Sequence, residues 1–467
     1  MAEATAQIPT ELGTENIGRL LKQYALPAII AQIAASLYNM VDSIYIGHMD
    51  SNAISGLAVT FPLMNLSTAF GTLVGAGAAT MVSILLGQKH YHMGNKVLGN
   101  VVSLNIIIGF LFMAGTLAFL DPILYFFGAS DNTLPYAKDY ITIILYGNIV
   151  THLYFGLNAA MRSSGNPKKA MGLTIFTVIF NAILDPIFIF GLDMGIAGAA
   201  WATVTAQVVA MFVVLHHFND QSRAIHFEKG IFRLNWNVAK KSLIIGTGPF
   251  LMNLAACAVT LFINQQLREF SGSADAGDDY IGAYGICNRV VFMFIMICMG
   301  LNQGMQPIAG YNYGARLYTR VKEVFWKTAK LAMCMTTLCF VIGMFFPRIA
   351  CSAFTSDPEL LDISERGMRL ITLVFPIVGL QMIGTNFFQS LGLVKKSIFL
   401  SLSRQLLLLL PLLYTLPLWL GTDGVWLSFP ISDLLSTILT IILLKRLFNK
   451  FNSLHDGDSA NALDSQL

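Results

Sequence analysis

The chain contains a series of long apolar stretches, each about the length needed to cross a lipid bilayer, and this feature limits the folds open to it. A membrane-spanning helix uses roughly 20 residues, and apolar residues make up 55% of the 467. Charged residues are 12% of the chain, about half of the roughly 25% that is typical of soluble proteins. The sequence therefore predicts an all-α polytopic membrane protein and excludes a soluble globule.

Short loops divide the apolar stretches into twelve predicted transmembrane helices. They are expected near residues 19–47, 54–86, 97–120, 136–161, 169–190, 195–218, 238–268, 280–311, 321–346, 362–391, 397–420 and 424–447. The widest connection lies in the middle of the chain, where two halves would be joined. The predicted parts are an N-terminal segment (1–18), an N-lobe (19–218), an inter-lobe linker (219–237), a C-lobe (238–450) and a disordered tail (451–467).

The distribution of positive charge predicts the orientation in the membrane. With the N-terminus inside, the inner loops carry most of the Lys and Arg residues, whereas the outer loops carry Lys138, Arg268 and Arg348. Loops rich in Lys and Arg stay in the cytoplasm. We therefore expect both termini to be cytoplasmic, in the inner membrane of a prokaryotic cell.

The two halves of the sequence resemble each other. A turn with a glycine followed by two lysines occurs at Gly165, before Lys168 and Lys169, and again at Gly392, before Lys395 and Lys396. Pro27 in the first predicted helix corresponds to Pro249 in the seventh. Both halves begin inside and have six helices each, so the repeat is parallel. Two such bundles with a central cavity are typical of a transporter.

Polar residues inside the predicted helices are the candidates for function, because an ionisable group in a membrane is costly. Asp42 and Asp185 both lie about five residues before the outer end of their helices, and therefore at a similar depth. Asn181 is one turn before Asp185 on the same helix face. Thr203 and Tyr140 lie at compatible depths. Pro186 frees a backbone carbonyl and favours a kink.

These side chains offer the hard oxygen ligands that suit an alkali cation such as Na⁺. Two close carboxylates in a poorly solvated site can equally share a proton. The sequence therefore predicts a site for a coupling cation, H⁺ or Na⁺, at Asp42, Asn181, Asp185, Thr203 and Tyr140. The alternative is a structural hydrogen-bond network between helices. No other metal and no organic cofactor is predicted.

The second half carries different charges within its predicted helices. These are Arg289, Arg404 and Asp433. Arg404 and Asp433 lie at similar depths and could form a buried pair, to which we assign a structural role. The uncharged polar residues Gln381 and Asn386 are candidates for the substrate cavity. His152, alone in an apolar helix, is interpreted as a packing residue.

Motifs of energy-coupling and hydrolytic enzymes are absent from the sequence. It contains no G-x-x-x-x-G-K-[S/T] phosphate loop and no H-E-x-x-H constellation. No basic block interleaved with aromatic residues indicates a nucleic acid partner. We therefore predict a protein that is not an enzyme, requires no ATPase subunit, is a monomer, and takes its energy from an ion gradient.

Several segments together resemble the multidrug and toxic compound extrusion (MATE) family. They are residues 38–42, 162–166, 181–186, 195–203, 284–289 and 306–314. The Asn181–Asp185–Pro186 pattern, with no acid in most of the seventh helix, is similar to the DinF-like branch. The resemblance implies export of bulky, often cationic amphiphiles in exchange for H⁺ or Na⁺. It also implies that the cation site lies in the N-lobe.

The function predicted from the sequence is thus multidrug efflux by cation antiport through alternating access. Pro27 and Pro186 are the expected conformational hinges. The substrate cavity is expected to include Tyr38, Asn39, Asn158, Gln381 and Asn386. Two alternatives stay open. One is a lipid-linked precursor flippase of the same superfamily, and the other is a channel or a non-transporting membrane protein.

Overall fold

A computed structural model describes residues 9–47, 51–272 and 274–457. It is all-helical in these ranges, and twelve helical segments are long and apolar enough to cross a membrane. A backbone in lipid must satisfy its hydrogen bonds within one segment, which favours helices for these apolar stretches. The twelve predicted transmembrane helices are confirmed, with ends within about two turns of those expected.

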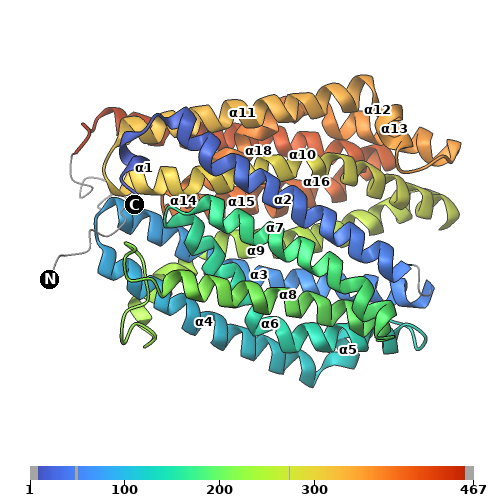
Figure 1. Cartoon of the computed structure of the whole chain (residues 1–467). Helices are drawn as coiled ribbons and strands as arrows, with labels where there is room; N and C mark the ends of the chain where they lie inside the picture. The colour runs from blue at the N-terminus through green and yellow to red at the C-terminus, as the bar shows by residue number, and fades with distance from the viewer. Residues whose placement is uncertain (1–8, 48–50, 273, 458–467) are drawn as a thin grey trace. The chain divides into compact units, whose positions relative to one another are not determined.

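The helices follow one another with short connections. The first part of the chain contains α1 (Glu11–Thr14), α2 (Ile17–Gly47), α3 (Ser51–Gly87), α4 (Tyr91–Ala118), α5 (Leu120–Phe126), α6 (Leu134–Ser163), α7 (Pro167–Pro186), the π-helical turn η1 (Ile187–Gly191), α8 (Gly195–Phe218) and α9 (Trp236–Phe270). Their path can be followed in Figure 1 from blue to yellow-green.

The second part of the chain is more often interrupted. It contains α10 (Ala274–Gly314), α11 (Tyr318–Phe345), α12 (Pro347–Ser352), α13 (Pro358–Ile371), η2 (Thr372–Val374), α14 (Phe375–Ser390), α15 (Val394–Leu402), the π-helical turn η3 (Ser403–Leu409), α16 (Leu410–Thr415), α17 (Pro417–Leu420) and α18 (Thr422–Asn452). One predicted helix thus corresponds to α13, η2 and α14 together, and the next to α15 through α17.

The chain forms two compact units. Among the described residues, unit 1 comprises 9–15, 30–47, 51–250 and 310–315, and unit 2 comprises 16–29, 251–272, 274–309 and 316–457. The inter-lobe linker and the first half of α9 thus belong to unit 1. The first half of α2 belongs to unit 2. The passage from one unit to the other occurs shortly after Pro27 in α2 and directly after Pro249 in α9.

Within unit 1, α3 packs along α4 and α6, α6 packs along α8, and α7 packs on α8. The first half of α9 approaches α3 very closely. A Cβ atom at Gly77 would lie 1.9 Å from the carbonyl oxygen of Ser242, and one at Gly246 would lie 1.7 Å from that of Leu73. Glycine is therefore needed at both positions for the two helices to meet.

Within unit 2, α11 packs along α14, and α14 packs along α18. A large core gathers residues of α9, α10, α13 and α18. In it the Tyr284 ring lies against Trp426 and is stacked on Phe429. The first half of α2 meets α10 at two glycines: a Cβ at Gly300 would lie 2.6 Å from Cα of Ile29, and one at Gly304 would lie 2.4 Å from Cα of Ala25.

The two turns that repeat in sequence have the same structure. Gly165 and Gly392 both have positive φ angles, 99° and 72°. The residue after each glycine donates its backbone N–H to the carbonyl five residues earlier, from Asn166 to Met161 and from Leu393 to Phe388. This is the hydrogen bond of a helix C-terminus that is closed by a left-handed glycine. The glycine is therefore required by the backbone in both halves.

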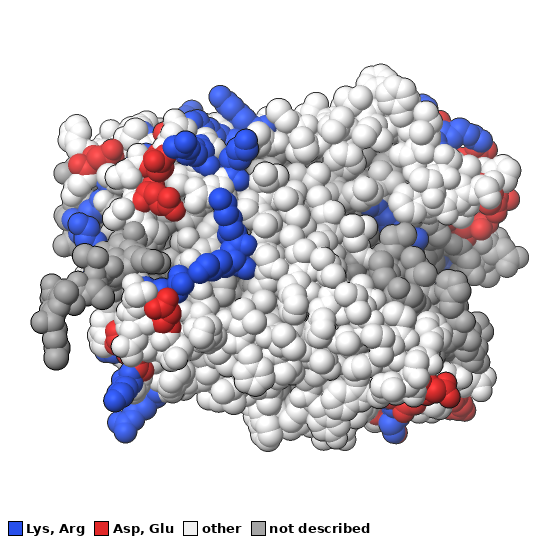
Figure 2. Space-filling model, in the orientation of Figure 1, with Lys and Arg blue, Asp and Glu red and all other residues white. Residues whose placement is uncertain are grey.

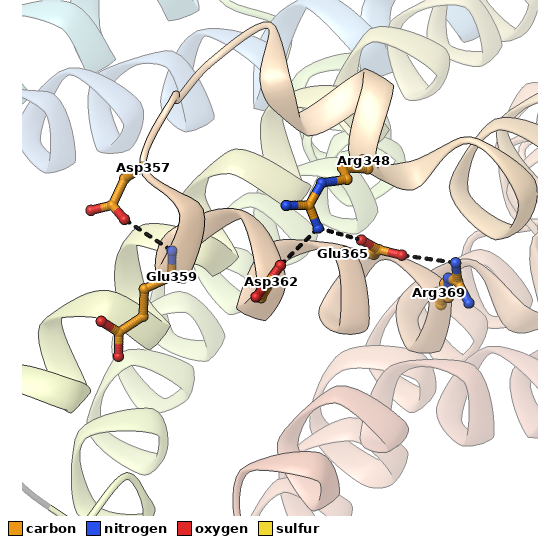
Figure 3. Close-up of polar contacts among 6 residues, drawn as sticks. All are labelled: Arg348, Asp357, Glu359, Asp362, Glu365 and Arg369. Atoms are coloured by element: carbon orange, nitrogen blue, oxygen red, sulfur yellow. Dashed lines mark hydrogen bonds and ion pairs between the residues drawn. The ribbon is translucent and has the colours of Figure 1, made fainter.

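Most of the charged residues on the surface lie toward the ends of the helices. Figure 2 shows Lys, Arg, Asp and Glu there, and a broad surface of other residues between. At one end of unit 2, Arg348 of α12 pairs with Asp362 and Glu365 of α13, and Glu365 also pairs with Arg369 (Figure 3). The uncharged middle of the helices is the surface expected to meet lipid.

Candidate functional site

The predicted cation site is partly assembled in unit 1 by α7 and α8. Asp185 is completely buried near the end of α7, and Asn181 lies one turn before it. The Asn181 amide nitrogen donates to Asp185 Oδ1 at 3.4 Å and to the Thr203 hydroxyl at 3.3 Å. The structure therefore brings together Asn181, Asp185 and Thr203.

The contacts of Asn181 favour the opposite orientation of its amide. With oxygen and nitrogen exchanged, the nitrogen donates to Asp185 Oδ2 at 3.2 Å and the oxygen accepts from the Thr203 backbone N–H at 2.9 Å. Such orientations are assigned from the hydrogen-bond network. In both orientations Asn181 donates to the Asp185 carboxylate and contacts Thr203, so it holds α7 and α8 together at this level.

The local sequence explains how Asp185 is presented. Pro186 ends α7, and the chain continues as the π-helical turn η1. Proline cannot donate a backbone hydrogen bond, and π-helical turns often occur at functional positions. The expected disturbance of the helix at Pro186 is thus a change from α to π geometry directly after Asp185.

Tyr140 lies in the same region of unit 1. It is 1% exposed and belongs to a cluster that contains Ile189 of η1 and Ala199 and Ala200 of α8. Ala199 lies one turn before Thr203 on α8. The ring of Tyr140 is therefore close to the elements that carry Asp185 and Thr203.

Three predicted residues lie on the last part of α2. The side chains of Tyr38, Asn39 and Asp42 are outside the described part of the structure, although the helix backbone is described to Gly47. Their assignment to the cation site and to the substrate cavity stays a prediction.

The remaining candidates for the substrate cavity make short-range contacts. Asn158 donates to the Ala170 carbonyl at 3.2 Å, at the other end of α7 from Asp185. Gln381 donates to the Thr385 hydroxyl at 3.3 Å, and Asn386 donates to the Met382 carbonyl at 3.0 Å, both within α14. Their role in binding substrate stays a prediction.

The charged residues predicted within the helices of the second half form one ion pair and leave one arginine apart from it. Arg404 Nε lies 2.6 Å from Asp433 Oδ1, so the structure forms this pair. The hydroxyl of Ser432 also donates to the Arg404 carbonyl at 2.9 Å. Arg289 is exposed on α10, and among the described residues it has no ion-pair partner.

A second buried polar cluster in unit 1 was not predicted as a group. Ser67 of α3 donates to Asn148 Oδ1 at 2.5 Å, and His152 Nε2 lies 2.9 Å from the Ser67 carbonyl. His152 thus joins α6 to α3, as its interpretation as a packing residue requires. Buried Asn105 of α4 has no hydrogen-bond partner among the described residues. Besides His152, the signal for this cluster in the sequence is the occurrence of Ser67, Asn105 and Asn148 within otherwise apolar helices.

Comparison with known proteins identifies the family. The MatE family model matches residues 27–187 and 250–415. The multidrug export protein MepA of Staphylococcus haemolyticus is 27% identical over 440 residues, which is 93% of this chain and 95% of the relative. MepA of Staphylococcus aureus is 26% identical over 430 residues, 91% of this chain and 93% of the relative.

Solved structures agree with this assignment. The MATE multidrug transporter DinF-BH, solved as a complex, matches with a TM-score of 0.85 and 34% identity, covering 95% of this chain and 98% of that one. An outward-facing MATE family transporter matches with a TM-score of 0.89 at 20% identity, covering 96% and 99%. This last similarity concerns the fold alone. The chain is a multi-pass membrane protein and belongs to the MATE family of transporters.

Proposed function

We propose that the protein exports amphiphilic, often cationic organic compounds in exchange for a cation, H⁺ or Na⁺. The names of the MepA relatives and of DinF-BH support multidrug export. The observation that carries the coupling proposal is the complete burial of Asp185 beside the amide of Asn181 and the hydroxyl of Thr203. A buried carboxylate is costly unless a bound cation or a proton balances its charge.

The proposed cycle uses competition for this carboxylate. Cation or proton binding at Asp185, together with Asp42, removes the negative charge that would hold a cationic substrate. Substrate is then released on the outer side, and the loaded site returns inward. Pro186 and η1 follow directly after the Asp185 carboxylate, and Pro27 lies inside α2; these are the proposed hinges.

The test is uptake of ethidium, a fluorescent organic cation, into inside-out vesicles that contain the protein. A pH gradient and a Na⁺ gradient are imposed separately, and wild type is compared with Asp185→Asn. The matched control is Asp193→Asn, because Asp193 is an exposed carboxylate eight residues further along the chain. Uptake that is driven by one gradient, retained in the control and lost in Asp185→Asn, is expected.

Two results would contradict the proposal. Gradient-driven uptake by Asp185→Asn at the wild-type rate would show that this carboxylate does not couple the cation. No uptake by the correctly inserted wild type under either gradient would favour the lipid flippase or the non-transporting alternative instead.

The proposed orientation places both termini in the cytoplasm and the protein in the inner membrane. It rests on the distribution of Lys and Arg among the loops. Fusion of alkaline phosphatase to the C-terminus should give an inactive enzyme, whereas fusion of green fluorescent protein should give a fluorescent one. The reverse pattern would overturn the orientation.

A further inference from the structure

The connection between α8 and α9 is bound along the first turns of α4. Figure 1 shows this linker in yellow-green beside α4, and both belong to unit 1. Two glycines of α4 accommodate two isoleucines of the linker. A Cβ atom at Gly94 would lie 2.5 Å from Ile225 Cδ1, and one at Gly99 would lie 2.2 Å from the Ile231 carbonyl oxygen.

An asparagine follows each of these glycines and binds the linker backbone. Asn95 Oδ1 accepts the N–H of His226 at 3.0 Å, and Asn100 Oδ1 accepts the N–H of Asn235 at 2.9 Å. Both asparagines are 1% exposed. Loss of either hydrogen bond is expensive, because it leaves a buried asparagine oxygen without that partner. The Gly-Asn pairs at 94–95 and 99–100 therefore form a repeated binding element for the linker.

A charged contact also joins the linker to the first turn of α4. Glu228 of the linker accepts a hydrogen bond from the Asn95 amide and lies 2.7 Å from His92 Nδ1. His226 Nε2 lies 3.9 Å from the other oxygen of Glu228, while His226 Nδ1 donates to the Arg223 carbonyl at 2.7 Å. One carboxylate is thus flanked by two histidine rings.

The surroundings of Glu228 favour its ionised form. Burial raises the pKa of the Glu228 carboxyl. The hydrogen bonds from Asn95 and His92, together with the positive charges of His92 and His226, lower it by more than burial raises it, so this pKa lies below its usual value. A carboxyl with a lowered pKa contributes its stabilisation above its ordinary pKa and loses it only in acid. Histidine is the type of side chain whose ordinary charge change falls between pH 5 and 8.

Other charged side chains occur on these segments. They include His90 and Lys96 on α4, Asp220, Arg223, Lys229 and Arg233 on the linker, and Lys169 at the start of α7. The charges that shift the Glu228 carboxyl are those of His92 and His226. A protonated histidine makes a charge-assisted hydrogen bond to a carboxylate, which is about twice as strong as a neutral one.

The linker leads directly into α9. Asn235 immediately precedes Trp236, the first residue of that helix, and the Ser103 hydroxyl donates to the Phe232 carbonyl at 2.7 Å. The first half of α9 then packs on α3 through Gly77 and Gly246. The bound linker therefore determines where α9 begins relative to α4.

We propose that Asn95, Asn100, His92, His226 and Glu228 are positioning residues that hold α9 to the first unit, and that protonation of the two histidines tightens this hold. We call the linker bound to α4 through these residues the clasp; it is held more tightly at pH 6 than at pH 8.5. The effect on export rests on the proposed function, whereas the clasp itself does not.

Hydrogen exchange of the linker measures the clasp without reference to transport. The purified protein is labelled at pH 6 and pH 8.5, and the rates are corrected for the intrinsic pH dependence of amide exchange. In wild type, protection of peptides covering residues 224–235 is expected to fall at least about fivefold from pH 6 to pH 8.5. In Glu228→Gln, it should be low and equal at both values.

A matched control separates the proposal from a general loss of structure. His90→Gln removes an exposed histidine two residues from His92 and should behave as wild type. Asn100→Ala should lower protection at both pH values but keep the pH difference, because it removes a neutral contact. Equal wild-type protection at pH 6 and pH 8.5, or a wild-type pH difference in Glu228→Gln, would overturn the proposal.

The consequence for transport is read from exchange of ethidium at equal pH on both sides, with no ion gradient. The ratio of the rates at pH 6 and pH 8.5 should differ between wild type and Glu228→Gln by about threefold or more. Unchanged ratios together with a pH-dependent clasp would show that the clasp does not act on transport. An absence of ethidium exchange in wild type would refute the proposed function and leave the hydrogen-exchange result standing.

Discussion

Arg404 of η3 and Asp433 of α18 form an ion pair of 2.6 Å in unit 2, in which the carboxylate is almost completely buried and the guanidinium is a quarter exposed. Both residues lie within helices that are apolar enough to cross the membrane. An ion pair in such surroundings gains little net stability over two apolar residues, yet its disruption is expensive, because one charge stays buried without a partner.

Removal of one partner should therefore cost more than removal of both. Arg404→Leu is expected to destabilise the protein by about 3 kcal/mol, whereas Arg404→Leu combined with Asp433→Leu should recover most of that loss. Thermal unfolding of the purified protein in detergent measures both. Arg366→Leu is the control, because the Arg366–Asp423 pair is exposed and should contribute at most about 1 kcal/mol. A double variant as unstable as the single one would contradict the prediction.

The hydroxyl of Thr203 should contribute to cation coupling. Thr203→Val keeps the shape of the side chain but removes the hydroxyl, which lies 3.3 Å from the Asn181 amide. A hydrogen bond between two neutral groups contributes about 0.5–1.5 kcal/mol, so the concentration of H⁺ or Na⁺ that gives half-maximal export should rise about two- to tenfold.

Two further variants test whether the hydroxyl itself matters. Thr203→Ser should restore most of the coupling. Thr205→Val, which changes a different face of the same helix, should behave as wild type. An equal effect of the two valine substitutions would indicate a general disturbance of α8.

The close contact of α3 with α9 predicts a large effect from one methyl group. Gly246→Ala would place a Cβ atom 1.7 Å from the Leu73 carbonyl oxygen, so the helices must separate. Overpacking of this kind costs about 1–3 kcal/mol. Gly172→Ala on α7 meets no atom within 4 Å and should instead stabilise its helix, by up to about 1 kcal/mol. The two melting temperatures should therefore move in opposite directions.

The N-terminus of α13 depends on a single side chain. Asp357 Oδ1 accepts the backbone N–H of Glu359 at 3.0 Å (Figure 3), which is the hydrogen bond of a helix N-cap. Asp357→Ala should cost about 1 kcal/mol and Asp357→Ser should keep most of the cap. Hydrogen exchange in the first turn of α13 measures the change. Glu359→Gln, which keeps the backbone N–H, should leave that exchange unaltered.

The hydrophobicity of the chain was sufficient to predict the transmembrane helices, because the bilayer imposes both length and composition. It could not predict α1, α5 and α12, which are too short to cross a membrane. The contact of Asn181 with Asp185 followed from their spacing on one helix. Its contact with Thr203 was inferred only from similar depth, because sequence alone does not say which faces of two helices meet.

The binding surface of the linker cannot be predicted from the sequence of the linker itself. Residues 219–237 are predicted only as a connection, since they lack the apolar length of a transmembrane helix. The signal for its binding surface lies in another element, as Gly94-Asn95 and Gly99-Asn100 on α4. A Gly-Asn pair indicates a binding surface only when the segment that it binds is known. The sequence does not show which segment packs on α4; the tertiary contacts do.

The exchange of helix halves between the units has a consequence for the chain as a whole. A break in the linker would separate residues 236–250 from the unit on which they pack, and would also leave residues 16–29 on the wrong fragment. No single cut can release two self-sufficient pieces. The two halves that are similar in sequence are therefore not independent domains, and a shortened version that keeps only one of them would lack part of its own core.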